Sequence, residues 1–93
     1  MGLIFEWDAA KAQHNIRKHG VSFREAMTAF GDKRSLTISD PLHSIEEDRF
    51  LLIGISQLGR LLVISFTERG HRIRIISSRL ATPRERHTYE TNL

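Results

Sequence analysis

The chain has 93 residues, a formal net charge of +3 and no cysteine. A chain of this length folds as one domain, residues 1–93, and buries roughly 60–65% of its unfolded surface. The lack of cysteine excludes disulfides and cysteine-ligated zinc or iron–sulfur centres. With neither a run of about 18 apolar residues nor a secretory signal, we expect a cytoplasmic protein without a membrane segment.

The charge is unevenly distributed along the chain. Residues 1–47 hold six Lys or Arg against seven Asp or Glu, whereas residues 48–93 hold eight basic against four acidic residues. All eight of those basic residues are Arg, whose planar fork suits phosphate better than the point charge of Lys does. This bias favours a nucleic acid as partner, although a merely soluble basic surface has the same composition.

The first predicted helix follows a short apolar stretch, residues 3–7, which predicts a small strand or an extended arm. Asp8 suits the N-cap of this helix, because its carboxylate can accept a backbone hydrogen bond. Gly20 suits its end, because glycine adopts the left-handed conformation without strain. A narrow inward stripe at i, i+4 and i+7 is expected from Ala12, Ile16 and His19.

A second helix is predicted directly afterwards. Ser22 and Glu25 have the spacing of a capping box, in which each side chain bonds the backbone of the other residue. The helix is expected to stop at Gly31 and to bury Phe23, Ala26, Met27 and Phe30.

Four strands follow in the middle of the chain. Alternating apolar residues predict strands at 35–39 and 50–57, separated by an acidic loop at 42–48. The stretch 61–79 predicts a hairpin, because two runs rich in Ile, Val, Leu and Phe flank a turn that contains Gly70.

A two-residue turn at Arg69-Gly70 would place Thr67 opposite Arg72 and Ile64 opposite Ile75. Because side chains alternate between faces, one face would be the core, with Leu62, Ile64, Phe66, Ile73 and Ile75. The other face would hold Leu61, Val63, Ser65, Thr67, Arg72, Arg74, Ile76 and Ser78.

A second two-residue turn, at Leu58-Gly59, would pair Ile55 with Leu62. That pairing adds three more side chains to the core face, those of Leu51, Ile53 and Ile55.

The C-terminal helix is predicted from a second capping box. Thr82 and Glu85 have the required spacing, and Pro83 occupies the first helical position, where proline is tolerated. The helix is expected to run through Arg86 and Tyr89. The predicted fold is α+β, with two N-terminal helices packed on a four-stranded antiparallel sheet and a C-terminal helix that partly covers the opposite face.

The open sheet face suggests phosphate chemistry. Arg72 and Arg74 lie two residues apart on it, flanked by Arg69 and Arg79. In RNA cleavage a 2′-hydroxyl attacks its own phosphate, and cations must stabilise the dianionic phosphorane that forms. Arg72 and Arg74 suit that role.

Proton transfer also needs an acid and a base, and four residues are candidates that spacing does not rank: Lys18, His19, Glu68 and His71. Each has a structural alternative. His19 is equally typical of a half-buried histidine, and Lys18 of a cation at a helix C-terminus. Glu68 can pair with a neighbouring arginine, and His71 can be a solvated turn residue.

No cofactor or metal is predicted, because His14 and His19, five residues apart, do not share one helical face. Phe50 is the one aromatic side chain expected on the arginine side. This scarcity counts against a binder that stacks bases on aromatic pairs.

The amino-acid sequence resembles that of the BrnT family of bacterial toxins. The resemblance runs from Phe5 to Glu90 and covers FEWDAAKAQHNIRKHGVSFREAMTAF, TISDP and TERGHRIRIISSRLATPRERHTYE. Its most specific parts, in order, are Trp7-Asp8, Lys18-His19-Gly20, Thr67-Glu68-Arg69 and Arg74-Ile75-Ile76-Ser77. His71 departs from the pattern, since an acidic residue is common in that turn.

The resemblance implies a RelE-like ribonuclease that stops translation as the toxin of a type II toxin–antitoxin module. It also implies a BrnA-type antitoxin with a ribbon-helix-helix DNA-binding part, through which alone operator DNA would be bound. We interpret five residues as catalytic: Lys18, His19, Glu68, Arg72 and Arg74. Three more are interpreted as RNA-binding: Arg69, Arg79 and Arg86. The alternative is a non-catalytic module that binds nucleic acid or the antitoxin and acts as a co-repressor.

Overall fold

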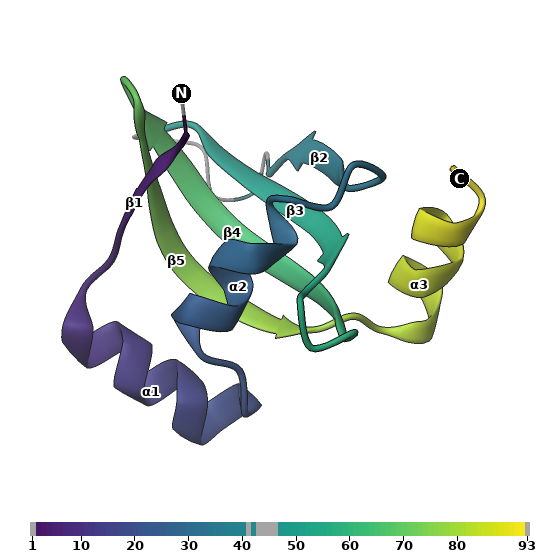
Figure 1. Cartoon of the computed structure of the whole chain (residues 1–93), viewed down its shortest axis with the longest axis horizontal. Coiled ribbons are helices and arrows are strands. Elements are labelled where there is room, and N and C mark those ends of the chain that lie inside the picture. The colour runs from purple at the N-terminus through teal and green to yellow at the C-terminus, as the bar shows by residue number, and fades with distance from the viewer. Residues whose placement is uncertain (1, 41, 43–46, 93) are drawn as a thin grey trace.

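A computed structural model describes residues 2–40, 42 and 47–92. Within these residues the chain forms three helices and one five-stranded mixed sheet, with strand order β1-β5-β4-β3-β2 (Figure 1). The elements are β1 (Ile4–Glu6), α1 (Ala9–His19), α2 (Phe23–Ala29), β2 (Leu36–Ser39), β3 (Arg49–Ile55), β4 (Leu61–Arg69), β5 (Arg72–Leu80) and α3 (Pro83–Glu90). The α+β class is confirmed. Residues 43–46 of the predicted acidic loop lie outside the described residues.

The fifth strand corrects the predicted sheet of four antiparallel strands. β1 pairs with β5 in parallel, with Ile4 opposite Arg72 and Glu6 opposite Arg74. Antiparallel neighbours are joined by short turns that a sequence displays, whereas parallel neighbours need a long connection. Here most of the chain separates the two strands, so no local pattern marks their pairing.

The predicted ends of α1 are confirmed. The carboxylate of Asp8 accepts a hydrogen bond from the backbone N–H of Lys11 at 2.9 Å. Gly20 ends the helix in the left-handed conformation, with φ of 68°, where a side chain would be strained.

Only one of the two hydrogen bonds of the capping box predicted at Ser22 forms. The Ser22 hydroxyl accepts from the backbone N–H of Glu25 at 3.0 Å. The Glu25 carboxylate, however, accepts from the Ser56 hydroxyl at 2.7 Å and forms an ion pair with Arg60. Buried Glu25 therefore ties α2 to the β3–β4 connection, and the hydrogen bonds from Arg60 and then Ser56 lower the pKa of its carboxyl against the effect of burial.

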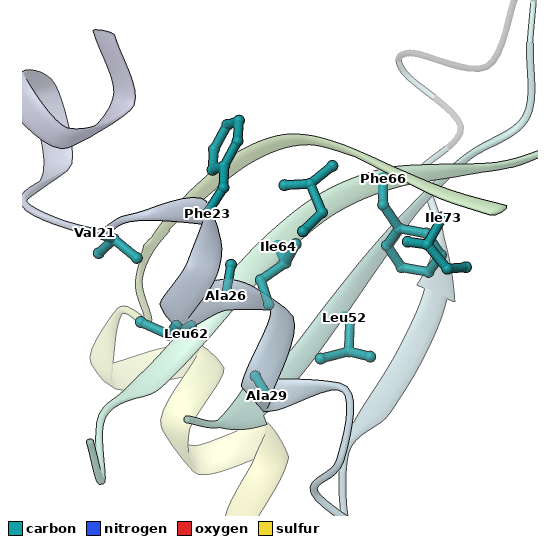
Figure 2. Packing of buried hydrophobic residues seen from close by; sticks show 10 residues of the cluster. Val21, Phe23, Ala26, Ala29, Leu52, Leu62, Ile64, Phe66 and Ile73 are labelled. Atoms are coloured by element: carbon teal, nitrogen blue, oxygen red, sulfur yellow. The ribbon is translucent and has the colours of Figure 1, made fainter. Parts of the chain in front are cut away.

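The main core lies between α2 and one face of the sheet (Figure 2). Phe23 and Ala26 are buried there as predicted, and Met27 and Phe30 pack at its border. The buried members are Val21, Phe23, Ala26, Ala29, Leu52, Leu62, Ile64, Phe66, Ile73 and Ile75.

The β4–β5 hairpin keeps its predicted core residues in a different register. Thr67 lies opposite Arg74 instead of Arg72, and Phe66 opposite Ile75. A shift of two residues leaves every side chain on its own face. The five core side chains predicted for this hairpin are therefore confirmed.

A bulge then changes the second half of β5. Phe66 pairs with Ile75, but its neighbour Ser65 pairs with Ser77, so Ile76 is an extra residue. An extra residue inverts the alternation beyond it. Ser78 is therefore fully buried opposite Ile64, which corrects its predicted place on the arginine side.

The β3–β4 register is off by one residue. Ile55 pairs with Leu61, not with Leu62, because the connection is longer than a two-residue turn. A slip of one residue moves every side chain to the other face. Leu52 and Phe50 therefore pack in the main core, and the predicted core positions Leu51, Ile53 and Ile55 are wrong.

Two of those displaced side chains, Leu51 and Ile53, join a second, smaller core beneath α3. Ile53, Leu61 and Val63 are buried against Tyr89, whose hydroxyl donates to Asp32 at 2.6 Å. The capping box of Thr82 and Glu85 that begins α3 is complete, as predicted. α3 covers one end of this face and leaves the other end open (Figure 1).

Asn15 attaches α1 to the edge of β5, next to the end of β1. Its amide donates to the backbone carbonyl of Ser78 at 2.7 Å and accepts from the Ser78 N–H at 3.1 Å. The side chain thus makes the two hydrogen bonds that another strand would make, and it also donates to Val21. The predicted stripe is corrected accordingly, because Ile16 is 49% exposed while Asn15 faces inward.

Asn15→Ala is expected to lower the free energy of unfolding by about 2–4 kcal/mol, because unsatisfied buried polar groups cost about 1–3 kcal/mol each. Urea unfolding at pH 7 measures the change. Gln13→Ala, on the exposed side of the same helix, is the control and should shift stability by less than about 0.5 kcal/mol. Equal stability of the two variants would contradict the role of Asn15.

Candidate functional site

A row of polar side chains crosses four strands on the sheet face opposite α2. Arg74 of β5 lies between Glu6 of β1 and Thr67 of β4, and Thr67 lies opposite Arg49 of β3. Directly paired residues project on the same side of a sheet. The four side chains therefore share the face that α3 leaves open.

Two further arginines extend this row towards the hairpin tip. Arg69 and Arg72 pair with each other, and each is two residues from a member of the row, so both lie on the same face. We call Arg49, Arg69, Arg72 and Arg74 the arginine face. Thr67, fully buried among them, has no hydrogen-bond partner for its hydroxyl within the described part of the chain.

One carboxylate holds two of these arginines together. Glu6 accepts from Arg72 and from Arg74, each at 3.3 Å. The hydrogen bond from Arg72 is the main cause that lowers the pKa of Glu6, against a smaller opposing effect of burial. Because one negative charge serves two guanidinium groups, the cluster remains cationic. The Arg72 side chain is 61% exposed and accessible to an anion.

A groove of about 400 Å³ lies beside this face, between α1 and the edge of β5. We call it the α1–β5 groove. Ser77 lines it from the strand and, through its pairing with Ser65, shares the face of Arg74. Its basic lining residues are Lys11, His14, Lys18 and His19, all on α1.

His19 is the half-buried member of this basic set. Burial is the largest cause that lowers its pKa, followed by the charges of Lys18, Arg79 and His14. A pKa below the ordinary 6.5 leaves the imidazole neutral at pH 7, so it can accept a proton. Lys18, by contrast, is exposed at the end of α1.

The other predicted RNA-binding residues take different places. Arg79 is bound by both oxygens of Glu85, at 2.7 and 2.8 Å, and so holds the start of α3 while its charge reaches His19. Arg69 pairs with Glu47 at 3.3 Å. Arg86 is exposed on α3 and belongs to neither the groove nor the arginine face.

Glu68 lies away from the predicted catalytic group. It pairs with the core residue Ile73 and, with His71 and Phe66, lines a separate pocket of about 230 Å³ on the α2 side of the sheet. The sheet thus separates its carboxylate from Arg72 and Arg74. Glu68 therefore does not belong to the arginine face, and its catalytic role stays a prediction.

Comparison with known proteins assigns the chain to a protein family. The family model described as the ribonuclease toxin BrnT of type II toxin–antitoxin systems matches residues 7–85. The chain belongs to the BrnT family. A solved structure, the ribonuclease toxin BrnT of Brucella abortus, is similar with a TM-score of 0.65 and 25% identity, over 87% of this chain and 99% of that one. A search of curated proteins found no match.

The family assignment confirms the resemblance seen in the sequence, and the fold is similar to that of the Brucella BrnT. Within the described ranges, no cluster of three or more His, Asp or Glu side chains suits a metal ion. None of the helices in those ranges is long and apolar enough to cross a membrane.

Besides Arg49 of the arginine face, sequence reasoning missed three residues of the site. Lys11 and His14 have a visible signal, because with Lys18 they recur at i, i+3 and i+7 on one helical face. Glu6 has none, because only the parallel β1–β5 pairing brings it to the arginines. Phe50, expected on the arginine side, packs in the main core instead.

Proposed function

We propose that this BrnT-family protein is a metal-independent RNA endonuclease, active in the cytoplasm, whose cleavage inhibits translation. The observation that carries the proposal is the position of His19. Its imidazole, with a lowered pKa, lies in a cationic groove that adjoins the arginine face. A base beside a phosphate-binding surface is what 2′-hydroxyl attack needs, and the ribonuclease assignment of the family supports RNA as substrate.

In this mechanism His19 accepts the proton of the 2′-hydroxyl as its oxygen attacks the adjacent phosphorus. The bond from phosphorus to the 5′-oxygen breaks, and Lys18 donates a proton to the departing oxygen. The products are a 2′,3′-cyclic phosphate and a free 5′-hydroxyl. Arg72 and Arg74 stabilise the negative charge of the phosphorane, which is often the largest catalytic contribution.

The arginines are already held together by Glu6, and this arrangement favours their acting as one unit. Side chains fixed before the substrate binds need little reorganisation when charge develops. Binding of a phosphate would replace part of the Glu6 interaction, since both ligands are anionic. Arg69 would extend the contact to a neighbouring phosphate, whereas Arg86, exposed on α3, is not part of the arginine face.

The same open face suits a BrnA-type antitoxin that carries a ribbon-helix-helix DNA-binding part. Apolar side chains border the arginines there, with Ile38 52% exposed and Leu51 half-buried. A segment of the antitoxin with acidic and apolar residues would match both the charge and the hydrophobicity. It would exclude RNA, and operator DNA would be bound only by the antitoxin in the complex.

The purified protein is expected to cleave single-stranded RNA in excess EDTA and to leave 2′,3′-cyclic phosphate ends, as read by mass spectrometry of the fragments. A DNA oligonucleotide of the same sequence is the control and should stay intact, because it lacks the attacking hydroxyl. Cleavage that disappears with the chelator would contradict metal independence. Binding of RNA without cleavage would favour the non-catalytic co-repressor.

A further inference from the structure

We propose that Lys11 and His14 form a second phosphate subsite for single-stranded RNA, next to the phosphate that is cleaved. The inference rests on the proposed ribonuclease function and concerns the end of the α1–β5 groove that the mechanism leaves unused. Neither residue has a catalytic role in that mechanism, yet both line the groove that contains His19.

The arrangement of α1 favours a strand that runs along the helix. Positions 11, 14 and 18 follow one another on one helical face, and the hydrogen bonds of Asn15 to Ser78 orient this face towards β5. A rise of about 1.5 Å per residue separates the backbones of Lys11 and Lys18 by roughly 10 Å. That separation fits successive phosphates better than two oxygens of one phosphate.

The charge of the groove identifies an anionic ligand. No Asp or Glu is among the described residues that line it, whereas Lys11 and Lys18 each bring a positive charge. Lys11 and His14 are exposed, so both can reach a phosphate at little cost. An acidic antitoxin segment has the same sign of charge, but continuity with His19 favours the RNA strand that His19 would act upon.

Lys11→Ala tests the subsite, with Arg17→Ala as the matched control. Both positions are exposed on α1 and both variants lose one positive charge, but Arg17 is absent from the groove lining. Alanine is a good helix former, so the fold should be retained. Binding is measured with a 2′-O-methyl RNA decamer, which cannot be cleaved, across a series of salt concentrations.

For Lys11→Ala we expect the salt dependence of log K to become shallower by about 0.7, the value for one phosphate contact on a single strand. Arg17→Ala should keep the slope of the original protein. In cleavage of a decamer, Lys11→Ala should raise KM about fivefold without lowering kcat. The rise in KM should be confined to substrates longer than a dinucleotide, which carries only one phosphodiester.

Equal slopes for Lys11→Ala and Arg17→Ala would overturn the subsite. So would an equal rise in KM on the dinucleotide, which would indicate a disturbed helix. Weaker antitoxin binding with unchanged RNA binding would assign the groove to the protein partner instead. If the unmodified protein cleaves no RNA, the proposed function fails, while the binding series still decides whether the subsite exists.

Discussion

Arg74→Gln is expected to lower kcat for RNA cleavage about 100- to 1000-fold, the usual cost of removing one preorganised group that stabilises transition-state charge. Arg74 is the less exposed of the two arginines held by Glu6, at 33% against 61% for Arg72. It lies on the strand two residues before Ile76 of the α1–β5 groove. Single-turnover cleavage of a labelled RNA measures the effect.

Glu6→Gln distinguishes catalysis from structure in this cluster. If the ion pairs only hold β1 against β5, removal of either partner should impair the protein equally. If the arginines act on RNA, Glu6→Gln keeps both positive charges and should change kcat less than about tenfold. Equal losses in Glu6→Gln and Arg74→Gln, with thermal unfolding shifted alike, would contradict the catalytic role.

His19→Asn is expected to lower kcat about 100- to 10,000-fold, the range for loss of a positioned general base. The neutral imidazole is the active form, so the rate should fall as the pH drops through the pKa of His19. Because burial and the charges of Lys18, Arg79 and His14 lower that pKa, the acid limb should lie below pH 6.5. A pH–rate profile of kcat/KM between pH 4.5 and 8.5, which reports the pKa values of the free enzyme, measures it.

Lys18→Gln provides the matching test of the electrostatics. It removes one of the charges that lower the pKa of His19, so the acid limb should move to higher pH, in addition to any loss of rate. Glu68→Gln, on the other face of the sheet, should leave the limb in place. An acid limb that stays unchanged in His19→Asn would show that another group is the base.

Local signals predicted the helices well because their determinants are close in sequence. Asp8, Gly20 and the Thr82–Glu85 box act within one helical turn, and all three behave as expected. Glu25 is the exception, because Arg60 and buried Ser56 compete for its carboxylate. Tertiary contacts there outweigh a local cap.

The strand registers were harder to predict because they depend on the position of the β4–β5 turn and on the length of the β3–β4 turn. An error of two residues in the β4–β5 hairpin kept the core, but an error of one residue in the β3–β4 connection exchanged Leu52 with Ile53. Leu, Ile and Val occupy both faces of these strands, since α2 and α3 cover opposite sides. Hydrophobicity alone therefore could not reveal the slip.

The sequence predicted only those parts of the candidate site that follow from the alternation of side chains along one strand. Arg72 and Arg74 lie on one strand, so alternation alone places them together, and the pairing with Glu6 agrees. Alternation from Phe66 also directs Glu68 to the core side, a signal that the chemical interpretation of Glu68 overlooked. The approach of His19 to β5 depends on Asn15, and no sequence pattern marks that contact.

The amide of Asn15 has a consequence for self-association. Because the amide hydrogen-bonds the backbone N–H and carbonyl of Ser78, another chain cannot pair a strand with β5 at that residue. The earlier part of the same edge of β5 is already paired with β1. Unpaired strand edges are the usual templates for uncontrolled polymerisation. Within the described residues, growth of the sheet is thereby left to the outer edges of β1 and β2, two short strands that offer a second molecule only three and four residues to pair with.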